Sequence, residues 1–144
     1  MSKLSEQKFS TMNTHPHEIV IIYDSSSTLA RQTLAYARTL SPHIKEWEYQ
    51  KTPFTTTIWK QLLFQLNMEP KELLDKSHPY YQQNIKGRSY DDEGWLYILK
   101  NNTYLIKSPI VVKGKKAILC TNPTQIFSLL QDEIAEAEQR TVNL

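Results

Sequence analysis

Residues 18–40 read EIVIIYDSSSTLARQTLAYARTL, and this stretch decides the fold. The unbroken apolar run 19–22 is rich in β-branched residues, which is typical of a central strand covered on both faces. Residues 24–28 then supply short hydroxyl and carboxylate side chains, the usual helix N-caps, just before apolar residues that recur at helical spacing. The sequence therefore predicts a strand, a tight polar turn and a helix that ends near Leu40.

The polar turn is the first candidate site. A helix that begins there directs its free N–H groups and the positive end of its dipole at the turn, which favours a small anion or a nucleophile of low pKa. Ser25, Ser26, Ser27 and Thr28 could bind such an anion, or they could simply cap the helix. Capping alone is enough to explain these residue types.

Composition limits the class of protein. With 144 residues and 40% hydrophobic content, the chain suits one compact domain, which we place at residues 18–144 after a flexible tail at residues 1–17. The net charge of +2 gives no clear sign of nucleic-acid binding, and no apolar run is long enough to span a membrane. We expect a cytoplasmic protein.

Cys120 is the only cysteine. A disulfide within the chain, a paired-thiol redox switch and a cysteine zinc cage are therefore all excluded. His15 and His17 flank a proline without a third ligand nearby, so we expect neither a metal nor a cofactor.

The remaining pattern predicts a mixed four-stranded sheet flanked by helices, an α/β fold with a helical insert. A proline inside the apolar run 104–112 interrupts a strand, and Lys113-Gly114-Lys115 turns it into a hairpin. The other expected elements are a strand at 44–49, helices after Thr55, Pro70 and Asp91, a polar loop at 80–88, a strand at 117–120 and a last helix at 124–140.

The order of these elements resembles the thioredoxin fold, and two segments resemble the arsenate reductase (ArsC) family within it. Residues 105–112, LIKSPIVV, are similar to the family signature Leu-Ile-x-Arg-Pro-Ile-Val-Val. Residues 73–76, LLDK, are similar to its Leu-Leu-Arg-Lys segment. The resemblance covers roughly residues 18–130, and it implies that Pro109 is cis and lies beside the active site.

The resemblance also implies where chemistry would lie. In the family, a single cysteine at the N-terminus of the first helix attacks arsenate, and three arginines hold the oxyanion. The cysteine position falls on Ser27 or Thr28, and the arginine positions fall on Asp75, on Ser108 and on Thr121 or Asn122. The binding residues that the resemblance implies here are Ser25, Ser26, Ser27, Thr28, Arg31, Lys107, Ser108 and Pro109.

These replacements favour loss of the family chemistry. An alcohol has a far higher pKa than a thiol and needs a general base, and no such base is evident in the sequence. The leading interpretation is a binding or regulatory module for an unknown protein partner or a small anion, by analogy with the Spx-type regulators that bind RNA polymerase. The alternative is a glutaredoxin-linked or thiol-linked oxidoreductase with a non-standard site at Ser27 or at Cys120, although a buried, inert Cys120 is favoured.

A third interpretation is a homodimer. It would use a surface rich in aromatic residues, formed by Trp47, Trp59, Tyr80, Tyr81 and Trp95.

Overall fold

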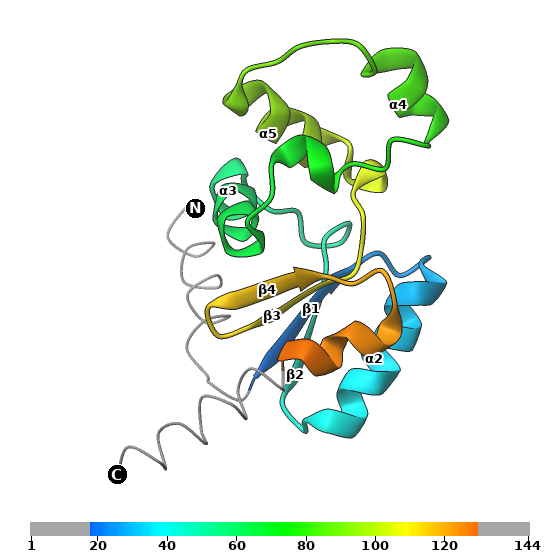
Figure 1. Ribbon diagram of the computed structural model, residues 1–144, viewed down its shortest axis with the longest axis vertical. Helices are drawn as coiled ribbons and strands as arrows, with labels where there is room; N and C mark the ends of the chain where they lie inside the picture. The colour runs from blue at the N-terminus through cyan, green and yellow to red at the C-terminus, as the bar shows by residue number, and fades with distance from the viewer. Residues whose placement is uncertain (1–17, 130–144) are drawn as a thin grey trace.

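The computed structural model describes residues 18–129, and its centre is a four-stranded sheet of order β2-β1-β3-β4 (Figure 1). β1 (Ile19–Tyr23) pairs in parallel with β2 (Ile44–Glu48) and antiparallel with β3 (Ile110–Lys113), and β3 forms a hairpin with β4 (Lys116–Leu119). The predicted mixed sheet, with the 19–22 strand inside it, is confirmed. The predicted tail at residues 1–17 and the last helix beyond residue 129 lie outside the described residues.

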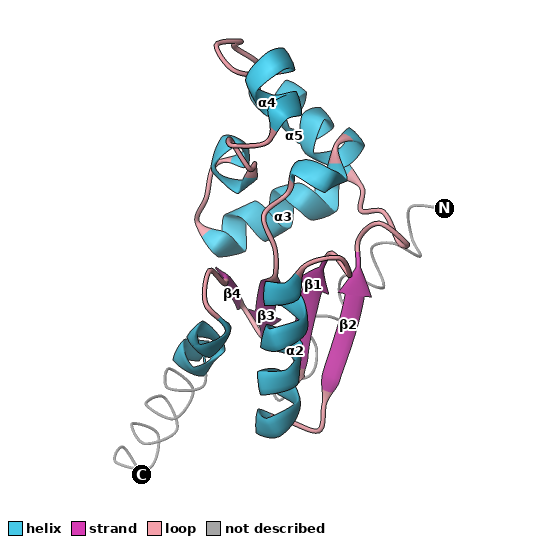
Figure 2. Ribbon diagram, turned by 90° about the vertical axis from the view of Figure 1, so that its right-hand side faces the viewer, coloured by secondary structure: helices cyan, strands magenta, loops and turns pink. Residues whose placement is uncertain are grey.

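Helices cover both faces of the sheet (Figure 2). α2 (Thr28–Leu40) packs on the face that presents Ile19, Ile21 and Val111, where the apolar cluster also takes in Ile126 and Leu129. The opposite face is covered by the helical insert. Its elements are α3 (Thr56–Leu66), η1 (Pro70–Leu73), α4 (Pro79–Asn84), α5 (Asp92–Asn101) and η2 (Thr103–Leu105). A short helix, η3 (Pro123–Gln125), follows β4, and residues 126–129 are α-helical, where the sequence predicts the start of a helix at 124–140.

The insert carries the larger core. Twenty buried residues of the described chain form the cluster on this face, against eight in the cluster under α2. Trp59 and Leu62 of α3 are fully buried, and so is Leu99 of α5. Figure 1 shows α3, α4 and α5 gathered in the upper half of the molecule, away from α2.

Two predicted elements are wrong in detail. The polar segment 80–88 is not all loop, because α4 begins at Pro79 and His78 caps it: the His78 Nδ1 accepts the Tyr80 N–H at 3.1 Å. The strand expected at 104–112 begins only after Pro109. Its first part instead runs beside residues 73–75, with the Lys107 N–H donating to the Leu73 carbonyl at 2.8 Å.

The aromatic surface proposed for a homodimer does not exist as such. Trp47, Trp59 and Tyr81 are buried in the core on the insert side, and Tyr80 is the only one of the five classed as exposed. Trp59 packs edge-on against Phe54 and Tyr49, so these rings fill the interior of the insert.

None of the helices in residues 18–129 combines the length and the apolar character that a membrane crossing requires.

Candidate functional site at the N-terminus of α2

The turn before α2 is held by its own side chains. Ser27 is the N-cap, and its Oγ accepts the Ala30 N–H at 3.1 Å. The Asp24 carboxylate accepts both the N–H and the hydroxyl of Ser26, at 2.9 and 2.8 Å. The capping role considered from the sequence is therefore present, and the Ser27 hydroxyl oxygen is already used by the helix it begins.

Tyr49 connects this turn with the loop before β3. Its buried hydroxyl donates to the Ile106 carbonyl at 3.3 Å and also interacts with Ser108. Burial raises the pKa of Tyr49 to about 12, and the negative charge of Asp24 adds to the rise. The Ser108–Pro109 peptide bond is cis, the form that the family resemblance implies.

A carboxylate from β2 also lies at the turn. A hydrogen bond from Ser25 lowers the pKa of Glu48, and Lys51 Nζ lies 3.1 Å from the same carboxylate. Burial raises the pKa of Tyr23 at the end of β1, and the charges of Glu46 and Glu48 raise it further. The turn therefore faces at least two carboxylates, Asp24 and Glu48.

Sequence reasoning missed Glu48 and Tyr49 as parts of this site. A signal was available, because the carboxyl ends of neighbouring parallel strands meet at one edge of a sheet. β1 ends at Tyr23 and its parallel partner β2 ends at Glu48, and the two residues are paired in register.

The position at which the family resemblance places an arginine in the insert holds Asp75. The Ser77 hydroxyl donates to the Asp75 carboxylate at 2.6 Å and lowers its pKa, and the positive charge of Lys107 lowers it further. Lys107 makes the smallest of these contributions. Arg31 is exposed on α2, where its Nη2 lies 3.5 Å from the Thr28 hydroxyl.

The remaining implied positions lie after β4. The carboxamide oxygen of Gln125 accepts from the backbone N–H groups of Thr121 and Asn122, which closes the turn that begins η3. Neither residue carries a cation that could hold an anion. Within residues 18–129, no set of three or more His, Cys, Asp or Glu side chains is arranged to hold a metal ion.

Cys120 is buried at the other side of this region. Only 1% of its surface is exposed, and its N–H donates to the Pro109 carbonyl at 3.0 Å. Burial in the apolar cluster under α2 raises the pKa of the thiol to about 11. The thiol is therefore neutral and shielded at physiological pH, which is unfavourable for a nucleophile.

Comparison with known proteins places the chain in a family. A search among curated proteins found no match. Among solved structures, a protein from Yersinia pestis described as a candidate arsenate reductase superposes with a TM-score of 0.72 at 26% identity, covering 77% of this chain and 99% of its own. An arsenate reductase from Vibrio cholerae gives 0.73 at 22% identity, covering 79% of this chain and 98% of its own.

An ArsC-related protein from Bacteroides fragilis has the same fold, with a TM-score of 0.64 at 15% identity over 78% of this chain and 98% of its own. The predicted thioredoxin-like α/β fold is confirmed by these neighbours. The model of the ArsC family matches residues 23–129, a span that includes the turn before α2, the helical insert and the β3–β4 hairpin. The chain belongs to the ArsC family.

Proposed function

We propose that this ArsC-family chain is a binding or regulatory module that has lost the thiol chemistry of arsenate reduction. The observation that carries the proposal is that a hydroxyl residue, and not a cysteine, occupies the position of the family nucleophile. Ser27 or Thr28 stands where the resemblance places the attacking cysteine, and the Ser27 Oγ already accepts an N–H of α2. The one thiol of the chain, Cys120, is buried and has its pKa raised to about 11.

Electrostatics supports the same proposal. Arsenate and phosphate are anions, and a site that holds them needs cations or free N–H donors. Here Asp24 and Glu48 lie at the turn, with Lys51 paired to Glu48 at 3.1 Å, and a carboxylate, Asp75, stands where the resemblance places an arginine. A small anion is therefore the weaker candidate for a ligand at residues 25–28, and a protein partner, as in the Spx-type regulators, is the stronger one.

The test combines binding and turnover. Arsenate, phosphate and sulfate are titrated separately into the full-length protein while amide chemical shifts are followed by NMR. A glutaredoxin-coupled arsenate reductase assay is run beside it, with the Vibrio cholerae enzyme as a positive control. The proposal predicts no turnover above background and no saturable shifts at residues 25–31.

Two variants identify the residue responsible if turnover does appear. Turnover that is lost in Ser27→Ala but kept in Cys120→Ala would establish the alternative, an oxidoreductase with a hydroxyl-based site. Turnover that is lost only in Cys120→Ala would assign the reaction to the thiol. Either result would overturn the binding-module proposal.

A further inference from the structure

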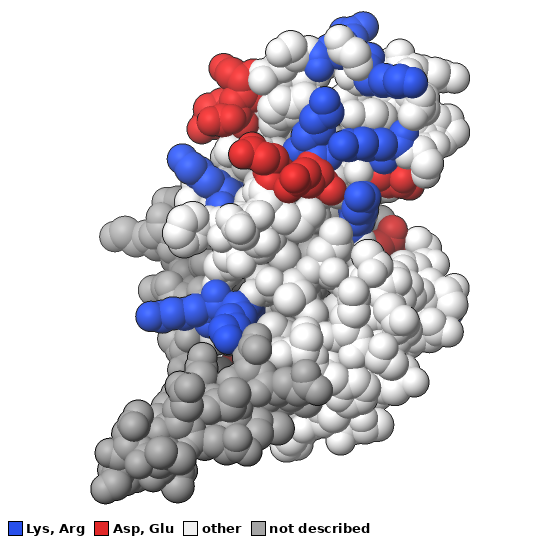
Figure 3. All heavy atoms as spheres, viewed as in Figure 1, with Lys and Arg blue, Asp and Glu red and all other residues white. Residues whose placement is uncertain are grey.

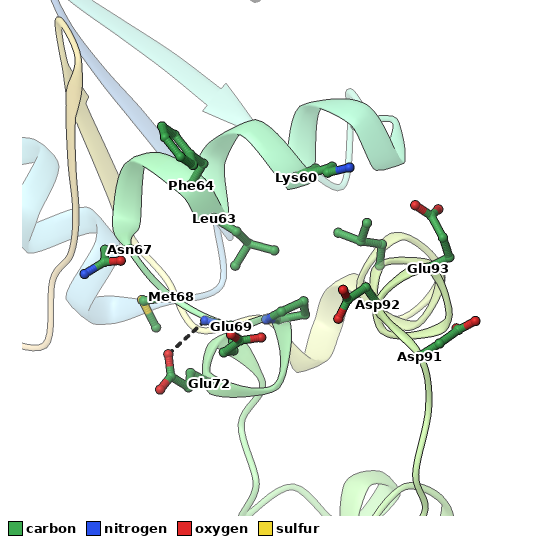
Figure 4. Close-up of a pocket in the computed structure, with 12 residues that line it drawn as sticks. Lys60, Leu63, Phe64, Asn67, Met68, Glu69, Glu72, Asp91, Asp92 and Glu93 are labelled. Carbon is green, nitrogen blue, oxygen red and sulfur yellow. Dashed lines mark hydrogen bonds between the residues drawn. The ribbon is translucent and has the colours of Figure 1, made fainter.

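A hollow lies on the insert, away from the turn before α2. It measures about 870 Å³ and lies between α3, η1 and α5 (Figure 4). Its lining residues are Lys60, Leu63, Phe64, Asn67, Met68, Glu69, Pro70, Glu72, Asp91, Asp92, Glu93 and Leu96. None of them belongs to the site described above.

The floor of this groove is apolar. Leu63 and Leu96 are almost fully buried, and Met68 is partly buried against the same core. Phe64 on α3 is 87% exposed, the most exposed of the large hydrophobic side chains in residues 18–129. Figure 4 shows Leu63 directed from α3 into the hollow, with Met68 below it. The floor therefore offers a small apolar contact surface beside one exposed aromatic ring.

The rim is acidic. Five carboxylates and one lysine are among the lining residues, so the groove carries a strong excess of negative charge. Three of the five also hold local structure: Asp91 accepts the Gly94 N–H at 2.7 Å as the N-cap of α5, and Glu69 and Glu72 form a reciprocal capping box. Asp92 and Glu93 are exposed in the first turn of α5.

Acidic side chains stand on two sides of the groove. Figure 4 shows Asp91, Asp92 and Glu93 on the α5 side, and Glu69 and Glu72 on the η1 side. In the space-filling view, acidic side chains lie at the upper left and in the centre of the upper half of the molecule, with Lys and Arg side chains beside the central group (Figure 3). An occupant that fits must therefore present positive charge to both walls and an apolar side chain to the floor.

We propose that this groove binds a basic amphipathic helix of another protein. Apolar side chains at helical spacing would rest on Leu63 and Met68 and against Phe64, while flanking Lys or Arg side chains would face Asp92 and Glu93. A two-fold contact between two copies of the chain would instead bring the same carboxylates together, which is repulsive. The inference rests on the proposed function and deepens it by naming a surface and a class of partner.

The test measures fluorescence anisotropy with three labelled peptides of equal length and the full-length protein. The first is an amphipathic Leu/Lys helix, the second has Glu in place of each Lys, and the third is a scrambled Leu/Lys sequence without an apolar face. The Leu/Lys helix is expected to bind saturably and to weaken as salt is raised. The Glu peptide and the scrambled peptide are expected to bind at least about tenfold more weakly, a difference of 1.4 kcal/mol.

Variants locate the binding surface. Asp92→Asn together with Glu93→Gln is expected to weaken binding of the Leu/Lys helix about tenfold. Phe64→Ser, at an exposed position where folding is not at risk, is expected to do the same by removing the apolar contact. Glu18→Gln is the matched control, because it removes a carboxylate that does not line the groove.

Three results would overturn the inference: equal binding of the scrambled peptide, equal loss in the Glu18→Gln control, or self-association of the chain in light scattering without peptide binding. Failure of the broader proposal gives a different signal, which is turnover in the reductase assay. Absence of both turnover and peptide binding would reject the groove alone.

Discussion

The reactivity of Cys120 is the sharpest quantitative prediction. Burial raises the pKa of this thiol from 9.0 to about 11, a change of roughly two units. Since the thiolate is the reactive form, at pH 8 the folded protein should contain roughly a hundredfold less of it than the unfolded chain. Because only 1% of the residue is exposed, restricted access should slow the reaction further.

The assay follows reaction with 5,5′-dithiobis(2-nitrobenzoic acid) at pH 8. Rates are measured for the native full-length protein and for the same chain unfolded in urea, with Cys120→Ala as the background. The native rate should be at least about a hundredfold lower than the unfolded rate. A native rate within tenfold of the unfolded rate would refute the reasoning and would return Cys120 to the list of candidate nucleophiles.

The raised pKa of Cys120 also makes the unfolding free energy depend on pH. The folded protein keeps the proton up to about pH 11, whereas the unfolded chain loses it near 9. The stability associated with this proton is therefore present below pH 9 and is lost as the pH rises from 9 to 11. Two units correspond to about 3 kcal/mol, so the unfolding free energy of the wild type should fall by up to about that amount relative to Cys120→Ala across this range.

Further predictions concern stability, measured by urea unfolding. Ser27→Ala should lower the unfolding free energy by about 1 kcal/mol, because it removes the N-cap of α2. Ser26→Ala should lower it by under about 0.5 kcal/mol, because the Ser26 hydroxyl bonds only within the exposed turn. Equal effects of the two substitutions would contradict the capping role. Tyr49→Phe should lower the unfolding free energy by about 1 kcal/mol at pH 7. This difference should change sign between pH 10 and 12, because the unfolded wild type ionises near 10 whereas the folded protein keeps the Tyr49 proton until about pH 12, which destabilises the wild type by more than its hydrogen bond contributes; a constant difference would disagree. Trp47→Phe should lower the unfolding free energy by about 1 kcal/mol more than Trp59→Phe. The Trp47 indole N–H donates to the Thr52 carbonyl at 3.1 Å, whereas the buried Trp59 indole N–H has no acceptor among the described residues. The reverse order would refute this reasoning.

The sequence was sufficient for the sheet because its signals there are local. The apolar run of β1, the hydroxyl N-caps of α2 and α3, and the Lys113-Gly114-Lys115 turn each determine structure within a few residues. Gly114 has a φ of +60°, a conformation that glycine adopts without strain, so the hairpin could be read directly from the chain.

The insert was harder to predict because its structure depends on contacts distant in sequence. Residues 104–108 have the composition of a strand, yet the chain there runs beside residues 73–75 in an isolated pairing that no local pattern shows. α4 was missed because histidine is an uncommon N-cap, although Pro79 at the first helical position was a usable signal. The sequence alone does not show that the rings of Trp47 and Tyr81 are buried. Trp47 packs against Phe54, and Tyr81 packs in the core of the insert, and both contacts depend on the fold.

The candidate site was predictable only in part for the same reason. The sequence located the turn at residues 24–28 and the loop at 107–109, since both stand in recognisable segments. It did not show that Tyr49 connects them or that Glu48 adds negative charge, because these contacts arise from strand pairing.

The unequal size of the two apolar clusters has a consequence for dynamics. Within residues 18–129, eight buried residues form the layer under α2, against twenty under the insert, so for this part of the chain we expect α2 to open by local unfolding at a lower free energy than α3 or α5. Amide protons of α2 should then exchange with solvent faster than those of β1. The candidate site at its N-terminus thus belongs to the less stable layer, and a ligand bound there would reveal itself by slowing exchange along this one helix.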